Sequence, residues 1–220
     1  MKIGVIGSGQ VGRTLASAFL KEGYDVMLGS RTSQKEEVIK WKEENASGKT
    51  GDFEQTAAFA DVIVLAVSGL VASNALQIAG IHHFAGKVVI DTTNPIAAEP
   101  PVNAVLKYFT TQDESLMEKL QRKAPHAKFV KAFNSVGNAL MYKPVFTDPK
   151  PTMFICGNDR DAKRDVAVIL DKFGWEPADF GRVESARAIE PLCMLWCIPG
   201  MINNEWMHAF KLLRMPAVLK

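Results

Sequence analysis

The residues that could do chemistry begin with a glycine turn near the amino terminus, Gly7-Ser8-Gly9-Gln10-Val11-Gly12. The turn follows an apolar run, residues 2–6, and precedes an amphipathic helical segment that Gly23 closes. Between a strand and a helix, such glycines permit a tight turn, close approach of a pyrophosphate and close packing of helix on strand. Amide groups at the start of the helix then attract the anion. The stretch predicts a dinucleotide site; the simpler alternative is a glycine turn in an ordinary βα unit.

The end of the next expected strand distinguishes between the two common nicotinamide dinucleotides. NAD-binding chains place an acidic residue here for the ribose hydroxyls. This chain instead has Ser30-Arg31-Thr32, with Lys35 one turn further on. A guanidinium can hold a 2′-phosphate through two charge-assisted hydrogen bonds. The pattern therefore predicts an NADP(H) site, with the alternative that Arg31 is an ordinary solvated charge.

Three other strand ends carry candidate residues. In an open α/β sheet, ligands bind beyond the carboxyl ends of the strands. The strongest apolar run ends at Ala66-Val67-Ser68, and Asn94 and Asn134 each close a strand. Their amides could hold a ribose, a nicotinamide or a substrate carbonyl, or could cap turns and helix starts. His82-His83 precede a strand and are expected at the opposite edge.

Acid–base groups are scarce in this set. Glu190 lies inside an apolar helical segment, where it either forms a salt bridge or lines the site. With Asn94 and Asn134 it completes the catalytic candidates. We find no Ser-His-Asp set, no zinc pattern and no lysine placed for catalysis, so no metal is expected. Such a site suits hydride exchange between two cofactors, because the organic partners do the chemistry and the protein aligns them. Reduction of a ketone would need a proton donor.

Apolar strand-like runs alternate with helical segments over residues 1–181, which is typical of a doubly wound, mainly parallel Rossmann sheet of the α/β class. Residues 48–51 are expected to form a loop. From residue 182 the pattern changes to two apolar helices, 185–196 and 204–213, separated by Pro199-Gly200. We therefore expect a dinucleotide-binding domain, 1–181, and a small helical C-terminal segment, 182–220, that contributes to the substrate cleft and to dimerisation.

Composition limits the remaining possibilities. A chain of 220 residues with a formal net charge of +2 gives no reason to expect a nucleic-acid partner. Three cysteines, an odd number, favour a reducing cytoplasm over a disulfide framework. The first residues lead directly into a strand without a signal-peptide pattern, and the apolar run 191–202 is too short to span a bilayer. We expect a cytoplasmic protein without a membrane segment.

Together these motifs resemble the F420-dependent NADP oxidoreductase family, and the same domain is similar to the cytoplasmic part of certain membrane ferric reductases. The resemblance covers most of the chain and rests on Gly7 to Gly12, Gly29-Ser30-Arg31 with Lys35, Ala66-Val67, Asp91-Thr92-Thr93-Asn94-Pro95, Lys131-Ala132-Phe133-Asn134, and Glu184-Ser185 leading to Glu190-Pro191-Leu192. It implies a Rossmann domain with a small C-terminal part, the second substrate between them, and a homodimer.

The resemblance also implies roles for single residues. Ser8, Gly9, Gln10 and Val11 would wrap the pyrophosphate. Ser30, Arg31 and Lys35 would bind the 2′-phosphate, and Val67 would lie by the dinucleotide ribose.

The run 193–200 departs from the pattern of deazaflavin users, which leaves a flavin, a quinone and an imine open as acceptors. The leading hypothesis is hydride transfer between NADPH and a deazaflavin (coenzyme F420) or flavin-like acceptor. The alternatives are an NADPH-dependent reductase of a small carbonyl or imine, with Glu190 or His208 as proton donor, and a non-catalytic NADPH-binding redox sensor.

Overall fold

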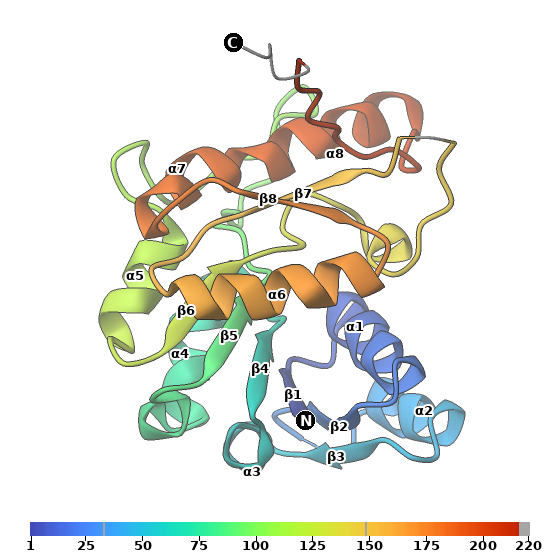
Figure 1. Cartoon of the computed structure of the whole chain (residues 1–220), viewed down its shortest axis with the longest axis vertical. Coiled ribbons are helices and arrows are strands. Elements are labelled where there is room, and N and C mark those ends of the chain that lie inside the picture. Colours follow the sequence, from blue (N-terminus) through green and yellow to red (C-terminus); the bar gives the residue numbers. More distant parts are fainter. Residues whose placement is uncertain (33, 148, 216–220) are drawn as a thin grey trace, which may run out of the picture.

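The computed structural model describes residues 1–32, 34–147 and 149–215. Within them, six strands form one parallel sheet in the order β3-β2-β1-β4-β5-β6 (Figure 1). The strands are β1 (Lys2–Ile6), β2 (Asp25–Gly29), β3 (Lys49–Gly51), β4 (Val62–Leu65), β5 (Val88–Asp91) and β6 (Lys128–Lys131). This order confirms the expected doubly wound Rossmann-like α/β sheet.

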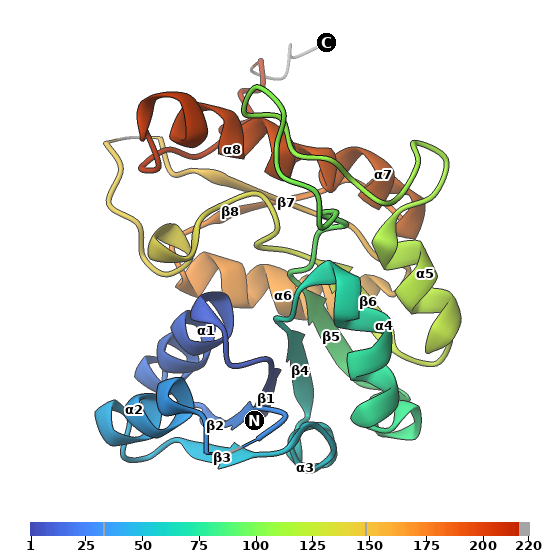
Figure 2. The same ribbon diagram turned by 180° about the vertical axis from the view of Figure 1, so that it is seen from behind.

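Alternate strand residues point to opposite sides of the sheet, so apolar side chains emerge on both faces. Helices cover both faces and bury these side chains. On one face Val5 and Val64 pack with α1 (Gln10–Lys21) and α6 (Arg160–Lys172). On the other, Ile63 and Leu65 pack with α3 (Phe53–Phe59), α4 (Gly69–Ile78) and α5 (Leu116–Lys123). Figure 1 shows α6 across one face, and Figure 2 shows α4 and α5 from the other side. The remaining elements of the first two thirds are α2 (Glu36–Glu44) and the 3-10 helices η1 (Ile81–Phe84) and η2 (Asn138–Leu140).

The expected loop at 48–51 is wrong. Residues 49–51 form β3, which pairs in parallel with β2 from Met27↔Lys49 to Gly29↔Gly51. A three-residue edge strand that contains a lysine and a glycine has too little apolar character to be recognised by pattern.

Two further strands form a separate sheet instead of extending the main one. β7 (Thr152–Ile155) and β8 (Glu176–Asp179) pair in parallel. One bridge, Lys131↔Cys156, connects the end of β7 to the end of β6. Figure 1 shows this pair between the main sheet and the C-terminal helices.

The C-terminal segment has less helix than the sequence predicts. It consists of η3 (Val183–Ser185), α7 (Ala186–Ile189) and α8 (Pro191–Asn203), and then an irregular stretch up to residue 215. The expected break at Pro199-Gly200 is wrong, because α8 continues through both residues and ends at Asn203. The expected helix 204–213 is also wrong. Residues 216–220 of the expected segment lie outside the described residues.

Local contacts explain both corrections. Asn204 takes a left-handed backbone conformation, with φ 59°, and reverses the chain. The side chain of Trp206 then lies on α8 at Gly200, where a Cβ atom would be 2.2 Å from Cε3 of the indole ring. Further on, the carbonyl of Phe210 accepts a hydrogen bond of 2.9 Å from the amide of Thr152 in β7. Trp206 and Phe210 therefore contact α8 and β7 from an irregular stretch, whereas Met207, Leu213 and Met215 are exposed.

None of the helices formed by the described residues has the length and apolar character needed to cross a bilayer.

Candidate functional site

The glycine turn lies between β1 and α1, and its close contacts require glycine. Gly7 has φ 121°, and a Cβ atom there would lie 2.2 Å from the carbonyl oxygen of Ala66. At Gly12 it would lie 1.8 Å from the carbonyl oxygen of Gly7. At Gly9, by contrast, no atom of the described residues lies within 4 Å of that position. The turn is therefore packed against the sheet on one side and open on the other.

The open side faces the amino terminus of α1. Gly9 is the N-cap residue, so its position supplies no capping side chain, and the first turn of α1 carries no acidic residue. The first amide groups of a helix lack partners within the helix and attract anions. This end of α1 is thus suited to a phosphate group.

A cavity of about 280 Å³ lies beside the turn, at the carboxyl edge of the sheet. It is lined by nine of the residues that the sequence predicts to bind the cofactor: Gly7, Ser8, Gly9, Ser30, Arg31, Lys35, Ala66, Val67 and Ser68. Three segments that lie apart in the sequence therefore meet at one hollow, as the topology of the sheet requires.

The other predicted cofactor residues lie outside this lining. Gln10, Val11 and Gly12 form the first turn of α1, and Thr32 lines a neighbouring cavity that also contains Arg31. Asn94 and Asn134 bind each other: the side-chain amide of Asn94 donates to the carbonyl of Asn134 at 2.7 Å. The side-chain amide of Asn134 donates to Oδ1 of Asn94 at 3.2 Å and to the carbonyl of Ile189 at 2.9 Å. These contacts connect the loops after β5 and β6 with the end of α7, and neither residue is part of the cavity lining.

Sequence reasoning missed six lining residues: Glu37, Phe53, Val71, Asn74, Ala75 and Ile78. Four of them lie on α4, where positions 71, 74, 75 and 78 form a stripe at helical spacing. Val71 and Ile78 are partly exposed although they are apolar. That stripe was a usable signal, because an apolar helix face that the core does not cover often lines a ligand site.

Charges gather at the β2 end of the cavity. Arg31 and Lys35 are cationic, and Nζ of Lys35 lies 3.6 Å from Oε1 of Glu37. The hydroxyl of Ser8 donates to the hydroxyl of Ser30 at 3.1 Å, which ties the glycine turn to the end of β2. The cavity therefore offers two cations at one end and apolar side chains from α4 on its wall.

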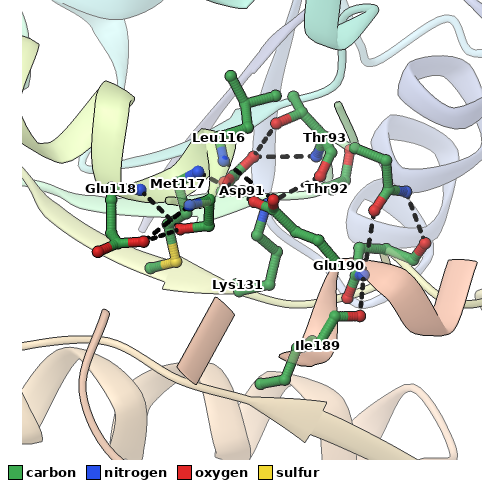
Figure 3. A network of polar contacts seen from close by, with 12 residues as sticks. Asp91, Thr92, Thr93, Leu116, Met117, Glu118, Lys131, Ile189 and Glu190 are labelled. Carbon is green, nitrogen blue, oxygen red and sulfur yellow. Dashed lines mark hydrogen bonds and ion pairs between the residues drawn. The ribbon is translucent and has the colours of Figure 1, made fainter. Parts of the chain in front are cut away.

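A buried ion network lies at the ends of β5 and β6, and sequence reasoning missed its centre, Lys131 (Figure 3). Nζ of Lys131 lies 2.7 Å from Oδ2 of Asp91 and 3.0 Å from Oε1 of Glu190, and it donates to the carbonyl of Thr93 at 2.8 Å. Burial alone lowers the pKa of a lysine, but the two carboxylates outweigh it, so that the pKa of Lys131 is raised above its ordinary value.

Glu190 takes part in this network from the C-terminal segment. Its two carboxylate oxygens accept hydrogen bonds, each 2.9 Å long, from the amides of Leu116 and Met117 at the start of α5. Its carbonyl accepts a hydrogen bond of 2.7 Å from the hydroxyl of Tyr108. Of the two interpretations of Glu190, these contacts favour the salt bridge. Gly69, at the start of α4, packs closely against the carbonyl of Asn94 in the loop after β5.

Similarity to known proteins decides the family. Residues 2–95 match the family described as "NADP oxidoreductase coenzyme F420-dependent". A solved structure of a proposed F420-dependent NADP reductase from Arthrobacter sp. FB24 has a TM-score of 0.90 and is 31% identical, covering 97% of this chain and 100% of that chain. The chain belongs to the F420-dependent NADP oxidoreductase family. All residues that line the 280 Å³ cavity fall within the matched range of the family.

Two curated relatives are similar to this family member over most of its length. The F420-dependent NADP reductase of Methanothermobacter thermautotrophicus is 29% identical over 211 residues, covering 89% of this chain and 87% of that protein. The rat metalloreductase STEAP3 is 29% identical over 206 residues, covering 91% of this chain. The chain spans only 39% of the length of STEAP3.

The histidines of this family member lie apart from the cavity. His82 and His83 are in η1, which precedes β5, so they lie at the amino edge of the sheet as expected. His208 stacks on Trp196, with ring centroids 5.1 Å apart, and its Nε2 lies 3.0 Å from the carbonyl oxygen of Trp196. Of the described residues that line the cavity, none is a histidine.

Proposed function

We propose that the protein transfers a hydride between NADP(H) and a tricyclic acceptor, the deazaflavin coenzyme F420 or a flavin-like molecule. One observation carries the proposal: Arg31 and Lys35 line the same cavity as the glycine turn, where an NAD-binding chain would place an acid. Family membership supports the same cofactor.

The residues of the cavity fit NADP(H) part by part. The turn Ser8-Gly9 and the amides of α1, including Gln10 and Val11, would hold the pyrophosphate. Arg31 and Lys35, with Ser30, would hold the 2′-phosphate through charge-assisted hydrogen bonds. The stripe on α4 would cover the adenine, since it presents apolar side chains to the cavity.

The chemistry of transfer is supplied by the bound nicotinamide, which carries the hydride. The chain contributes binding and alignment. The described lining contains neither histidine nor cysteine, and its charged side chains are Arg31, Lys35 and Glu37. We propose exchange between two organic cofactors in preference to reduction of a carbonyl, which requires a proton donor. Asn94, Asn134 and Glu190 are then positioning residues of the loops beside the site.

The acceptor is proposed from the relatives. The reductase of Methanothermobacter thermautotrophicus, whose name specifies F420, matches over nearly its whole length. Metal reduction is a second candidate because of the similarity to STEAP3, although the chain spans only 39% of that protein.

The same proposal includes the organisation of the protein. Residues 1–181 would be the dinucleotide-binding domain, and 182–220 would form part of the acceptor cleft. The α8 residues Leu195 and Ile202 are exposed and apolar, and we propose that this face packs against a second copy in a cytoplasmic homodimer.

Oxidation of NADPH, followed by its absorbance, tests the function. The acceptors are F420, FMN, a quinone, a ferric chelate and a cyclic imine, each at the same concentration. Turnover with F420 or FMN is expected. Turnover with the imine alone would identify a small-molecule reductase, and turnover with the ferric chelate alone would favour metal reduction. Binding of NADPH without turnover of any acceptor would indicate a sensor.

A further inference from the structure

The cationic end of the cavity contains a carboxylate. Of the described residues that line the cavity, Glu37 alone is acidic, and it lies in the first turn of α2. Its Oε1 lies 3.6 Å from Nζ of Lys35, the N-cap residue of the same helix. The carboxylate of Glu37 thus lies beside Lys35, one of the two cations proposed to bind the 2′-phosphate.

Glu37 also borders a second cavity, between α1 and α2, where Arg13 is part of the lining. A hydrogen bond from its own backbone amide lowers the pKa of Glu37 below its ordinary value. Burial opposes this effect, and the charges of Lys35 and Arg13 add to it. Glu37 is therefore ionised at neutral pH, and its position at the start of a helix favours the same charge state.

We propose that Glu37 is a specificity-determining residue, which competes with the 2′-phosphate of NADP(H) for the ammonium group of Lys35. This inference rests on the proposed function, because it requires NADP(H) in this cavity. A phosphate that binds Lys35 must separate it from Glu37 and must tolerate the neighbouring negative charge. NAD(H) carries an uncharged hydroxyl in place of this phosphate, so it has no negative charge with which to draw Lys35 away from Glu37. Glu37 therefore reduces the affinity for NADP(H) only, and it favours release of the dinucleotide after hydride transfer.

Isothermal titration of NADPH and NADH into wild type, Glu37→Gln and Glu36→Gln tests the competition. Glu36 is the matched control: it lies in the same turn of α2, is exposed and is absent from the cavity lining, and the substitution changes the net charge equally. Glu37→Gln should tighten NADPH binding by roughly two- to fivefold, the range expected for one exposed ion pair. The affinity of Glu37→Gln for NADH should change less than about twofold. The affinities of Glu36→Gln for NADPH and NADH should also change less than about twofold.

A double-mutant cycle with Lys35→Met tests whether Glu37 acts through Lys35. In the Lys35→Met background the gain from Glu37→Gln should disappear. The competition is wrong if the gain persists there, if Glu37→Gln weakens NADPH binding, or if Glu36→Gln tightens it equally. A different result would overturn the NADP(H) site itself: equal affinity of the wild type for NADPH and NADH, with Arg31→Ala weakening both alike. A wild-type preference for NADPH with a neutral Glu37→Gln would overturn only the competition.

Discussion

Glu190 and Lys131 form an ion pair inside the protein, with 3.0 Å between Oε1 and Nζ, and the two side chains are 2% and 0% exposed. Glu190 belongs to the junction of α7 and α8, whereas Lys131 ends β6. A second carboxylate, Asp91, shares the same ammonium at 2.7 Å. The remaining negative charge is partly balanced by the amides of α5 that bind Glu190, since a helix amino terminus carries partial positive charge. The buried ion pair between Glu190 and Lys131 thus holds the C-terminal segment against the carboxyl edge of the sheet.

Lys131→Met should destabilise the protein strongly, because it leaves Asp91 and Glu190 buried without their cation. Removal of one partner from a buried ion pair costs about 3–5 kcal/mol of the free energy of unfolding. Lys128→Met is the matched control on the same strand: its ammonium pairs with Asp159, but its side chain is 39% exposed. That change should cost less than about 1 kcal/mol. Denaturant unfolding at pH 7 measures both, and equal losses would contradict the buried network.

A second ion pair, between Glu118 of α5 and Arg187 of α7, gives the stability a pH dependence. Burial alone would raise the pKa of Glu118, but hydrogen bonds from Arg187 and Ser115 lower it from 4.5 to about 2. The folded state therefore keeps this carboxylate ionised at pH values where the unfolded chain binds a proton. The stabilisation is complete above about pH 4.5 and is lost as the pH falls toward 2.

Glu118→Gln should accordingly be less stable than wild type at pH 7, and the difference should narrow between pH 4.5 and pH 2. Thermal unfolding at several pH values between 7 and 2.5 measures the difference. A gap that stays constant over this range would mean that Glu118 is not held ionised by its partners.

The glycine turn and the cationic end of the cavity could be predicted because their signals are local. Gly7 and Gly12 lie within one strand–turn–helix unit, and Arg31 and Lys35 lie at the end of the next strand. Apolar runs likewise predicted the strands, since a parallel sheet covered on both faces needs continuous apolar segments. Lys131 could not be predicted in this way. Lys128 and Lys131 stand at the two ends of the same four-residue strand, yet one is partly exposed and the other is fully buried.

What distinguishes the two lysines is their distant partners, Asp91 and Glu190, and no local pattern reports those. The helix predicted for the residues after Asn203 was wrong for a related reason. Their apolar side chains read as a helix face, but Trp206 is placed by a contact with Gly200 on the preceding helix, and Phe210 by a contact with β7. Tertiary contacts of this kind override a periodic pattern.

Arg31→Ala should weaken binding of NADPH at least tenfold while changing that of NADH by less than about twofold. Each charge-assisted hydrogen bond to a phosphate contributes roughly 1.5–3 kcal/mol, and NADH has no phosphate at this position. Arg164→Ala is a control, because Arg164 is an exposed residue of α6 that pairs with Asp161. Titration calorimetry with both dinucleotides measures the effect. Losses of equal size for NADPH and NADH would contradict the phosphate role of Arg31.

Replacement of both His82 and His83 by Asn should leave turnover within about twofold of wild type. These residues lie in η1, before β5, whereas the cavity opens at the carboxyl edge of the sheet. The rate of NADPH oxidation with the acceptor that the panel identifies measures the effect. A loss of turnover at unchanged thermal stability would show that one of these histidines takes part in the reaction, and it would contradict a site confined to the carboxyl edge.

Gly200→Ala tests how the segment after α8 is held. A Cβ atom at this position would lie 2.2 Å from Cε3 and 2.4 Å from Cδ2 of Trp206, so the indole ring must move. Overpacking of this kind costs about 1–3 kcal/mol, which exceeds the gain of up to about 1 kcal/mol from replacing glycine by alanine within a helix. The variant should therefore be less stable than wild type, and its tryptophan fluorescence should shift as Trp206 leaves α8. In the Trp206→Leu background the same substitution should cost little, because the ring that it meets is gone. Higher stability of Gly200→Ala than of wild type would mean that Trp206 does not rest on Gly200 in solution.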